Sequence, residues 1–141
     1  MAAKLGAEVF APDAGRYNKR DWSPELGDYR ADPVAFPNGL AELANHVRGL
    51  GMKFGIWVEI ENAGVDSELA RMHPDWFLRR NGEPITTGAR RHLNFALPAV
   101  RKWARGVVDG LVRDAGIEWI KIDYNIDIGD SFDPHGPGCA T

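Results

Sequence analysis

The sequence predicts an α/β fold in which parallel strands alternate with helices in the order βαβαβ. Three apolar segments have the length and composition of buried strands, and they cover residues 8–13, 53–61 and 118–125. Between these segments, apolar residues recur at helical spacing. Because right-handed crossovers return the chain in the same direction, we expect the three strands to run parallel.

The first strand and the first helix are expected in the N-terminal part of the chain. The strand covers 8–13 and ends in the carboxylate of Asp13, where the sequence Asp-Ala-Gly begins a long loop. Pro37 and Asn38 introduce a helix that stops at Gly51. Its apolar residues fall at helical spacing, and they are Leu40, Leu43, Ala44, Val47 and Leu50.

The second strand, residues 53–61, places acidic and aromatic side chains together. Alternation puts Trp57, Glu59 and Glu61 on one face. The opposite face is apolar and consists of Ile56, Val58 and Ile60.

An insertion of about residues 62–97 is expected to cover one end of the sheet. Within it, Asp66 is placed to cap a short helix that ends at about Met72. Asn81 and Gly82 form the turn between two short extended pieces. The arginines of this region are expected on a solvated hairpin, and they are Arg79, Arg80, Arg90 and Arg91.

The last helix and strand complete the domain. Pro98 is placed as the first residue of a helix that closes at Gly116. The strand that follows puts Lys121, Asp123 and Asn125 on one face, and we expect Trp103 and Trp119 in the core. The predicted domain covers residues 1–128, and the Gly-, Pro- and Asp-rich residues 129–141 form a flexible tail.

Polar side chains follow all three predicted strands. In a parallel sheet the carboxyl ends of the strands meet at one edge, where α/β proteins bind their ligands. A solvated charge cluster at one strand end would be unremarkable, but three separate strands that converge on acids favour a functional site. The residues expected there are Asp13, Trp57, Glu59, Glu61, Lys121, Asp123 and Asn125.

The composition excludes several classes of partner. The 141 residues are 44% hydrophobic and 26% charged, as in an ordinary globular domain. A net charge of -3 without a basic stripe argues against nucleic acid, and no apolar run is long enough to span a membrane. The single cysteine, Cys139, permits no disulfide within the chain. We therefore expect a cytoplasmic protein with a small neutral or cationic partner.

Metal binding, sugar binding and proton transfer all suit this set of residues. The lysine beside Asp123 and the irregular spacing of the acids argue against a metal, so we predict neither metal nor cofactor. Carboxylates and a lysine suit sugar hydroxyls, and an aromatic face packs on a pyranose ring. A cation nearby keeps Asp123 ionised, as a nucleophile at an anomeric carbon must be. Structural or surface roles are expected for His46, His73, His92 and His135.

Six motifs occur in an order that is similar to a known enzyme family. They read EVFAPDAGRY, LGDYRADPVAFPNGL, GLGMKFGIWVEIEN, HPDWFLRRNGEP, HLNFALPAVRKW and IEWIKIDYN. From about Leu5 to Asp127 the chain resembles the catalytic barrel of bacterial α-galactosidases of glycoside hydrolase family 36. The resemblance implies part of a TIM-type (β/α)8 barrel, a partial or half barrel, in a retaining enzyme that cleaves terminal α-galactosyl residues.

The resemblance also implies roles for individual residues. Asp123 matches the nucleophile, Lys121 and Asp13 match contacts to sugar hydroxyls, and Trp57 is expected to line the pocket. Asn125 matches a residue that orients the substrate or the nucleophile. Two further acidic positions bind substrate and match Glu59 and Glu61. The partner implied is a galactose-containing oligosaccharide.

The chain departs from the family in several places. Arg16 occupies a position that is usually tryptophan, Ile60 stands where a proline is usual, and Asn62 where arginine or methionine is frequent. A complete barrel needs at least about 200 residues, and the matched segment stops before the family's general acid/base and glycine-rich loop. Glu59, Glu61 and Asp127 could in principle replace that acid, but their strands adjoin that of Asp123 and we do not expect it.

Two functions therefore stay open. The first is an α-galactosidase-type hydrolase, and the second is a non-catalytic or engineered half-barrel scaffold that self-assembles into a homo-oligomer. Self-assembly is expected because an open fragment exposes sheet edges and apolar strand faces. The residues expected to need such cover are Val9, Phe54, Ile56, Val58, Ile120 and Ile122.

Overall fold

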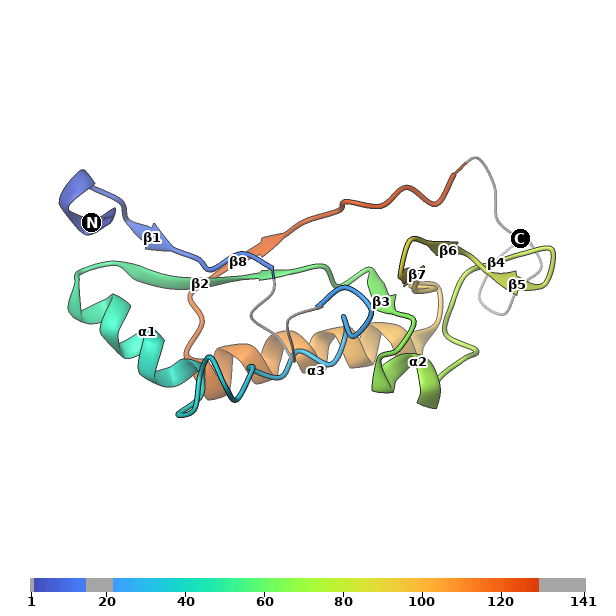
Figure 1. The fold of residues 1–141 in the computed structure, drawn as a ribbon, viewed down its shortest axis with the longest axis horizontal. Helices are drawn as coiled ribbons and strands as arrows, with labels where there is room; N and C mark the ends of the chain where they lie inside the picture. Colours follow the sequence, from blue (N-terminus) through green and yellow to red (C-terminus); the bar gives the residue numbers. More distant parts are fainter. Residues whose placement is uncertain (1, 15–21, 130–141) are drawn as a thin grey trace.

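A computed structural model of the protein describes residues 2–14 and 22–129 (Figure 1). After a short 3-10 helix, Ala2–Leu5, the elements are β1 (Val9–Phe10), α1 (Leu40–Gly49), β2 (Lys53–Val58), β3 (Asn62–Gly64), α2 (Glu68–Met72), β4 (Arg79–Arg80), β5 (Glu83–Pro84), β6 (Thr86–Thr87), β7 (Arg90–His92), α3 (Pro98–Ala115) and β8 (Trp119–Ile122). The predicted positions at Arg16, His135 and Cys139 lie outside the described residues.

The main sheet has the strand order β1-β2-β8 and is parallel throughout. β2 pairs with β8 in a register that sets Gly55 beside Trp119 and Trp57 beside Lys121. Figure 1 shows the sheet as one layer with α1 and α3 along one side of it. The predicted parallel α/β order is confirmed.

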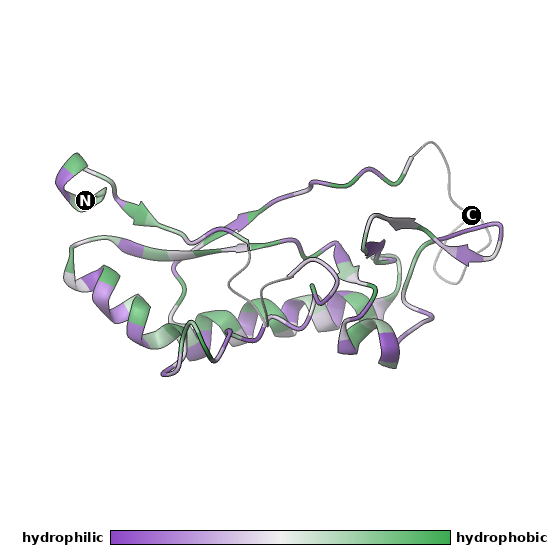
Figure 2. Cartoon of the chain, in the orientation of Figure 1, coloured by the Kyte–Doolittle hydropathy of each residue, from purple (hydrophilic) through white to green (hydrophobic). Residues whose placement is uncertain are grey.

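The two main helices end where the sequence predicts. α1 runs from Leu40 to Gly49, and α3 begins at Pro98 and is capped by Gly116 in the left-handed conformation, with φ of 62°. That conformation suits glycine because it has no Cβ. Figure 2 shows hydrophobic and hydrophilic residues mixed along α3, as expected for a helix with one buried face.

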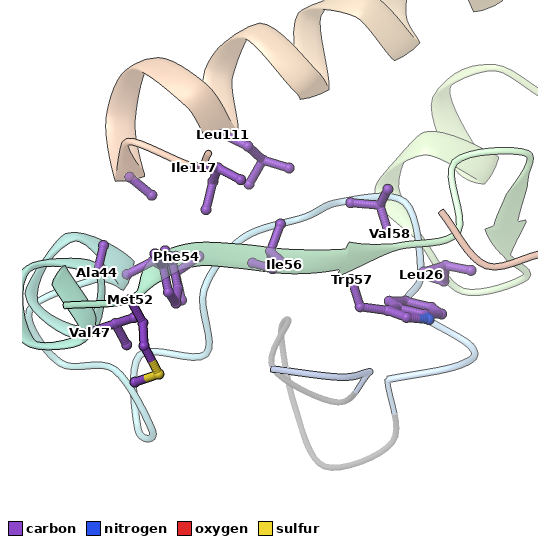
Figure 3. Close-up of a cluster of buried hydrophobic side chains, with 12 residues drawn as sticks. Leu26, Ala44, Val47, Met52, Phe54, Ile56, Trp57, Val58, Leu111 and Ile117 are labelled. Atoms are coloured by element: carbon purple, nitrogen blue, oxygen red, sulfur yellow. The ribbon is translucent and has the colours of Figure 1, made fainter. Parts of the chain in front are cut away.

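The core lies between β2 and the helices. Phe54, Ile56 and Val58 are each at most 1% exposed. In Figure 3, Ile56 and Val58 point toward the side of Leu111, whereas Trp57 points to the opposite side of the strand. The expectation that these three aliphatic and aromatic side chains would need a second copy for cover was wrong, because α1 and α3 already bury them.

The last strand, β8, lies at one edge of this sheet. Ile122 is 65% exposed and Trp119 is 43% exposed. Trp119 was therefore wrongly predicted as a core residue. It lies above Gly55, where a Cβ would meet its Cε3 atom at 2.9 Å, on the face of the sheet that the two main helices do not cover.

The insertion forms two small antiparallel sheets. One has the order β3-β7-β6, and the other is the β4-β5 hairpin. Asn81 and Gly82 connect that hairpin with φ angles of 54° and 82°, which suits a two-residue turn of type I′ and confirms the predicted turn. A second hydrophobic cluster, which includes Phe77 and Leu93, joins the insertion to α3 through Val100.

The short helix α2 is capped differently from the prediction. The hydroxyl of Ser67, not the carboxylate of Asp66, accepts the backbone N–H of Ala70 at 3.0 Å. The carboxylate of Asp28, which lies far away in the sequence, accepts the N–H groups of Glu68 and Leu69. The Ser67 hydroxyl and the Asp28 carboxylate together accept hydrogen bonds from three backbone N–H groups in the first turn of α2.

The strands are shorter than predicted. β1 ends at Phe10 and β2 at Val58, and the chain beyond β2 turns into β3 of the insertion. Within the described ranges 2–14 and 22–129, no helix has the length and apolar character needed to cross a bilayer.

Candidate active site

Asp123 is the centre of the candidate site and directly follows β8. Its Oδ2 atom lies 3.1 Å from the indole Nε1 of Trp57, which donates a hydrogen bond, and 3.1 Å from Nζ of Lys121. The same Nζ lies 3.3 Å from Oδ2 of Asp13. Residues that lie in, or just after, the three strands of the main sheet therefore meet at its carboxyl edge, as predicted from the sequence.

The register of the sheet explains this meeting. Trp57 and Lys121 are direct neighbours across β2 and β8, so their side chains stand on the same face. Two residues further on, Asp123 returns to that face, and its backbone N–H is bonded to the carbonyl of Val58. The predicted face of Lys121 and Asp123 is confirmed by this pairing.

Hydrogen bonds and charge keep Asp123 ionised. The indole N–H of Trp57 contributes most to holding the pKa of Asp123 below its ordinary value, followed by hydrogen bonds from Asn125 and Lys121. A backbone N–H from Ala14 is the main cause of the lowered pKa of Asp13. In turn, the hydrogen bond with Asp123 raises the pKa of Lys121. The site is an ionised acid–lysine–acid cluster at neutral pH.

Exposure differs sharply among the predicted site residues. The side chain of Asp13 is 70% exposed, that of Lys121 40% and that of Asp123 31%. Asn125 is also exposed. By contrast, Trp57 is only 1% exposed, and its indole N–H is directed at the carboxylate of Asp123.

Glu59 is buried in the interior and does not reach the exposed part of the site. It is fully buried, and it forms an ion pair with Arg90 and accepts a hydrogen bond from Asn62 at 2.9 Å. Burial raises the pKa of Glu59, and the guanidinium of Arg90 opposes this effect. This placement favours a supporting role over the substrate contact that we predicted.

Glu61 has the most perturbed carboxyl group of the cluster. Burial is the main cause that raises its pKa to about 7, and the negative charges of Glu59 and Asp123 act in the same direction. Its Oε1 atom is buried and has no hydrogen-bond partner in the described part of the chain. Glu61 is therefore a proton-carrying group near neutral pH.

Two residues of this neighbourhood were not among the predicted site residues. Trp22 packs edge-on against Trp57, with ring centroids 5.2 Å apart and planes at 78°. Arg90 holds its guanidinium 5.3 Å from the ring centre of Trp22. Arg90 was wrongly placed on a solvated hairpin, since its side chain is only 18% exposed. Nothing in the local sequence distinguishes it from Arg91, because its acidic partner is 31 residues away.

Other hollows lie away from this cluster. The cavity of about 420 Å³ beside α3 is lined by residues of α1, α3 and the loop 28–39, and none of them belongs to the candidate site. Across residues 2–14 and 22–129, no three His, Cys, Asp or Glu side chains are grouped so that they could hold a metal ion.

A parallel β/α sheet that presents an ionised aspartate, a lysine and a supporting indole at its carboxyl edge has the architecture of a segment of a glycoside hydrolase. The profile of the Melibiase family matches residues 1–138, and the chain belongs to this family. The predicted resemblance to α-galactosidases of glycoside hydrolase family 36 is thereby confirmed.

Curated relatives and solved structures give the same assignment. The chain is 40% identical to an α-galactosidase of Escherichia coli over 126 residues, which are 88% of this chain and 18% of the relative. It superimposes on a family 36 α-galactosidase of Geobacillus stearothermophilus, AgaA in complex with raffinose, with a TM-score of 0.78 and 34% identity. That match covers 86% of this chain and 17% of the other.

A third relative agrees with these two. The α-galactosidase of Lactobacillus brevis matches with a TM-score of 0.78 and 34% identity, again over 86% of this chain and 17% of that one. The chain thus spans less than a fifth of the length of each of these three relatives.

Proposed function

We propose that the protein acts in retaining hydrolysis of terminal α-galactosyl residues, with Asp123 as the nucleophile. The observation that carries the proposal is the carboxylate of Asp123, held by the indole of Trp57 and by Lys121 at the carboxyl edge of the sheet. A nucleophile must be ionised to attack an anomeric carbon, and both donors lower its pKa.

Three exposed polar groups are proposed to bind the sugar. Asp13 accepts hydrogen bonds from sugar hydroxyls, Lys121 donates to another, and Asn125 orients the substrate or Asp123. Glu61, which lies between β2 and β3, adds a further contact. The proposed substrate is a galactose-containing oligosaccharide, since structures of the relative AgaA contain raffinose and stachyose.

A general acid is the second requirement of the proposed reaction. Retaining hydrolysis places two carboxyl groups about 5–5.5 Å apart, one to attack and one to protonate the leaving group. Glu59 does not suit the second role, because Arg90 and Asn62 engage its carboxylate in a fully buried position. In the family resemblance, this acid follows the segment that the motifs cover.

Release of nitrophenol from an activated α-galactoside tests the proposal. Such a leaving group needs little protonation, so turnover depends mainly on the nucleophile. Asp123→Asn should abolish release, whereas Asp109→Asn on the exposed side of α3 should leave it unchanged. If the wild-type chain and Asp123→Asn release nitrophenol equally slowly, the nucleophile assignment is wrong.

Covalent capture provides an independent readout. An activated fluorinated α-galactoside that forms a slowly hydrolysed glycosyl-enzyme should add one sugar to the intact mass of the wild-type chain. Peptide mapping should place the sugar on Asp123, and Asp123→Asn should remain unmodified. Modification of a different carboxylate would contradict the assignment.

A second candidate is a self-assembling scaffold without turnover. The observation that favours it is the exposure of apolar residues at the end of β8, where Ile122 is 65% exposed, and just after it, where Tyr124 is 58% exposed. Among the described strands β8 has a neighbour on one side only, so its free edge can pair with a second copy. A compact monomer in sedimentation at micromolar concentration would argue against this homo-oligomer.

A further inference from the structure

We propose that Arg90 is a positioning residue of the candidate site, which fixes the indole of Trp57 toward Asp123 through contacts with Glu59 and Trp22. Arg90 lies in β7, the central strand of the insertion sheet, and is paired there with Gly64 on one side and Thr87 on the other. The insertion thus presents a rigidly held arginine to the end of β2.

The first contact of Arg90 fixes the backbone beyond Trp57. Its guanidinium pairs with the fully buried carboxylate of Glu59, two residues after Trp57. A buried charge without its partner is strongly unfavourable, so this pair holds both side chains in one arrangement. Asn62 donates to the other oxygen of Glu59 and completes the set.

The second contact of Arg90 is with the indole of Trp22, which in turn contacts the indole of Trp57. The guanidinium stands over Trp22 at 5.3 Å, in the geometry of a cation–π interaction. Trp22 in turn packs edge-on against Trp57 at 5.2 Å, and Nε1 of Trp57 lies 3.1 Å from Oδ2 of Asp123. Because Trp57 is 1% exposed, its ring can rotate only if these neighbours move.

The consequence for the reaction depends on the proposed function, whereas the positioning itself does not. An indole held toward Asp123 stabilises the carboxylate form, which is the nucleophilic form. A displaced indole would leave the carboxylate with one strong donor fewer. Arg90 therefore acts through other residues and need not touch the sugar.

Nuclear magnetic resonance of the full chain tests this inference without requiring turnover. The indole N–H signal of Trp57, assigned with Trp57→Phe, and the side-chain carboxyl signal of Asp123 are followed through a pH titration. In Arg90→Met we expect the Trp57 signal to lose its dependence on Asp123 ionisation. The pKa of Asp123 should also rise by roughly half a unit to one unit.

Arg91→Met is the matched control, because Arg91 is the next residue and lies over Phe77 instead, at 5.9 Å. It should leave both signals unchanged. Arg90→Lys keeps the charge opposite Glu59 but loses the flat group over Trp22, so partial retention of the wild-type pKa is expected. Equal titration curves for Arg90→Met and Arg91→Met would overturn the proposal.

Trp22→Leu keeps the inference testable if Arg90→Met does not fold. This variant leaves the ion pair of Arg90 and Glu59 in place and removes only the indole between Arg90 and Trp57. It should raise the pKa of Asp123 as Arg90→Met does, and an unchanged pKa would contradict the positioning route. Failure of the nitrophenol assay would refute the proposed hydrolysis but would not change these titrations.

Discussion

At the scale of single residues, three acidic side chains near Trp57 have different environments although they look alike in the sequence. They are Asp123, Glu59 and Glu61. Asp123 is partly exposed and stabilised in its charged form by an indole and a lysine. Glu59 is buried but paired with Arg90. Glu61 is largely removed from water, and one of its oxygens has no partner among the described residues. Alternation along a strand predicts which face these acids occupy, but not which of them meets a cation.

Glu61 should make stability depend on pH. Its folded-state pKa of about 7 lies above the ordinary value of 4.5, so the folded chain binds this proton more tightly than the unfolded chain. The resulting stabilisation is complete below about pH 4.5 and is lost as the pH rises toward 7. Glu61→Gln, which resembles the protonated acid, should stabilise the chain at pH 8 by at most about 3 kcal/mol.

Urea unfolding at pH 4.5 and at pH 8 measures this difference. The gain from Glu61→Gln should be small at the lower pH and largest at the higher one. Glu83→Gln, at an exposed position in β5, should change stability equally at both values. A gain from Glu61→Gln that does not vary with pH would show that the carboxyl group does not titrate as described.

At the scale of elements, the sequence predicts helices and turns better than the contacts between them. Pro98, Gly116 and the Asn81-Gly82 turn act through their own backbone conformations, so their positions can be predicted locally. The first turn of α2 depends on Asp28, about 40 residues away, and no local signal reveals that contact. Strand ends are equally hard to predict, because pairing partners decide where a strand stops.

The capping of α2 can be tested at two adjacent positions. Ser67→Ala removes the oxygen that accepts the N–H of Ala70, and we expect a loss of about 1 kcal/mol in the free energy of unfolding. Asp66→Ala should cost clearly less, because Asp66 is exposed and its side chain does not cap the helix. Denaturant unfolding of both variants makes the comparison. Equal losses would restore Asp66 as a capping residue.

At the scale of the whole molecule, the parallel sheet and its polar edge follow from the sequence, whereas the links across the molecule do not. Asp13, Lys121 and Asp123 come together because three strands run in the same direction. The connection from Arg90 through Trp22 joins the insertion to the sheet, and it depends on contacts between residues far apart in the chain. α1 and α3 bury β2, whereas the two outer strands of the sheet keep exposed apolar residues, and the most exposed of these is Ile122 of β8.

Charge on that edge should weaken any association between copies of the chain. Ile122 is 65% exposed, so Ile122→Lys removes apolar surface from the edge without opening a hole in the core. Sedimentation over a range of concentrations should show a more monomeric species for Ile122→Lys than for the wild type, with little change in the urea midpoint. Val34→Lys, at a position that is 89% exposed and far from β8 in the sequence, should sediment like the wild type. Since a charged edge disfavours strand pairing while a distant surface charge does not, equal association of all three proteins would exclude β8 as the contact between copies.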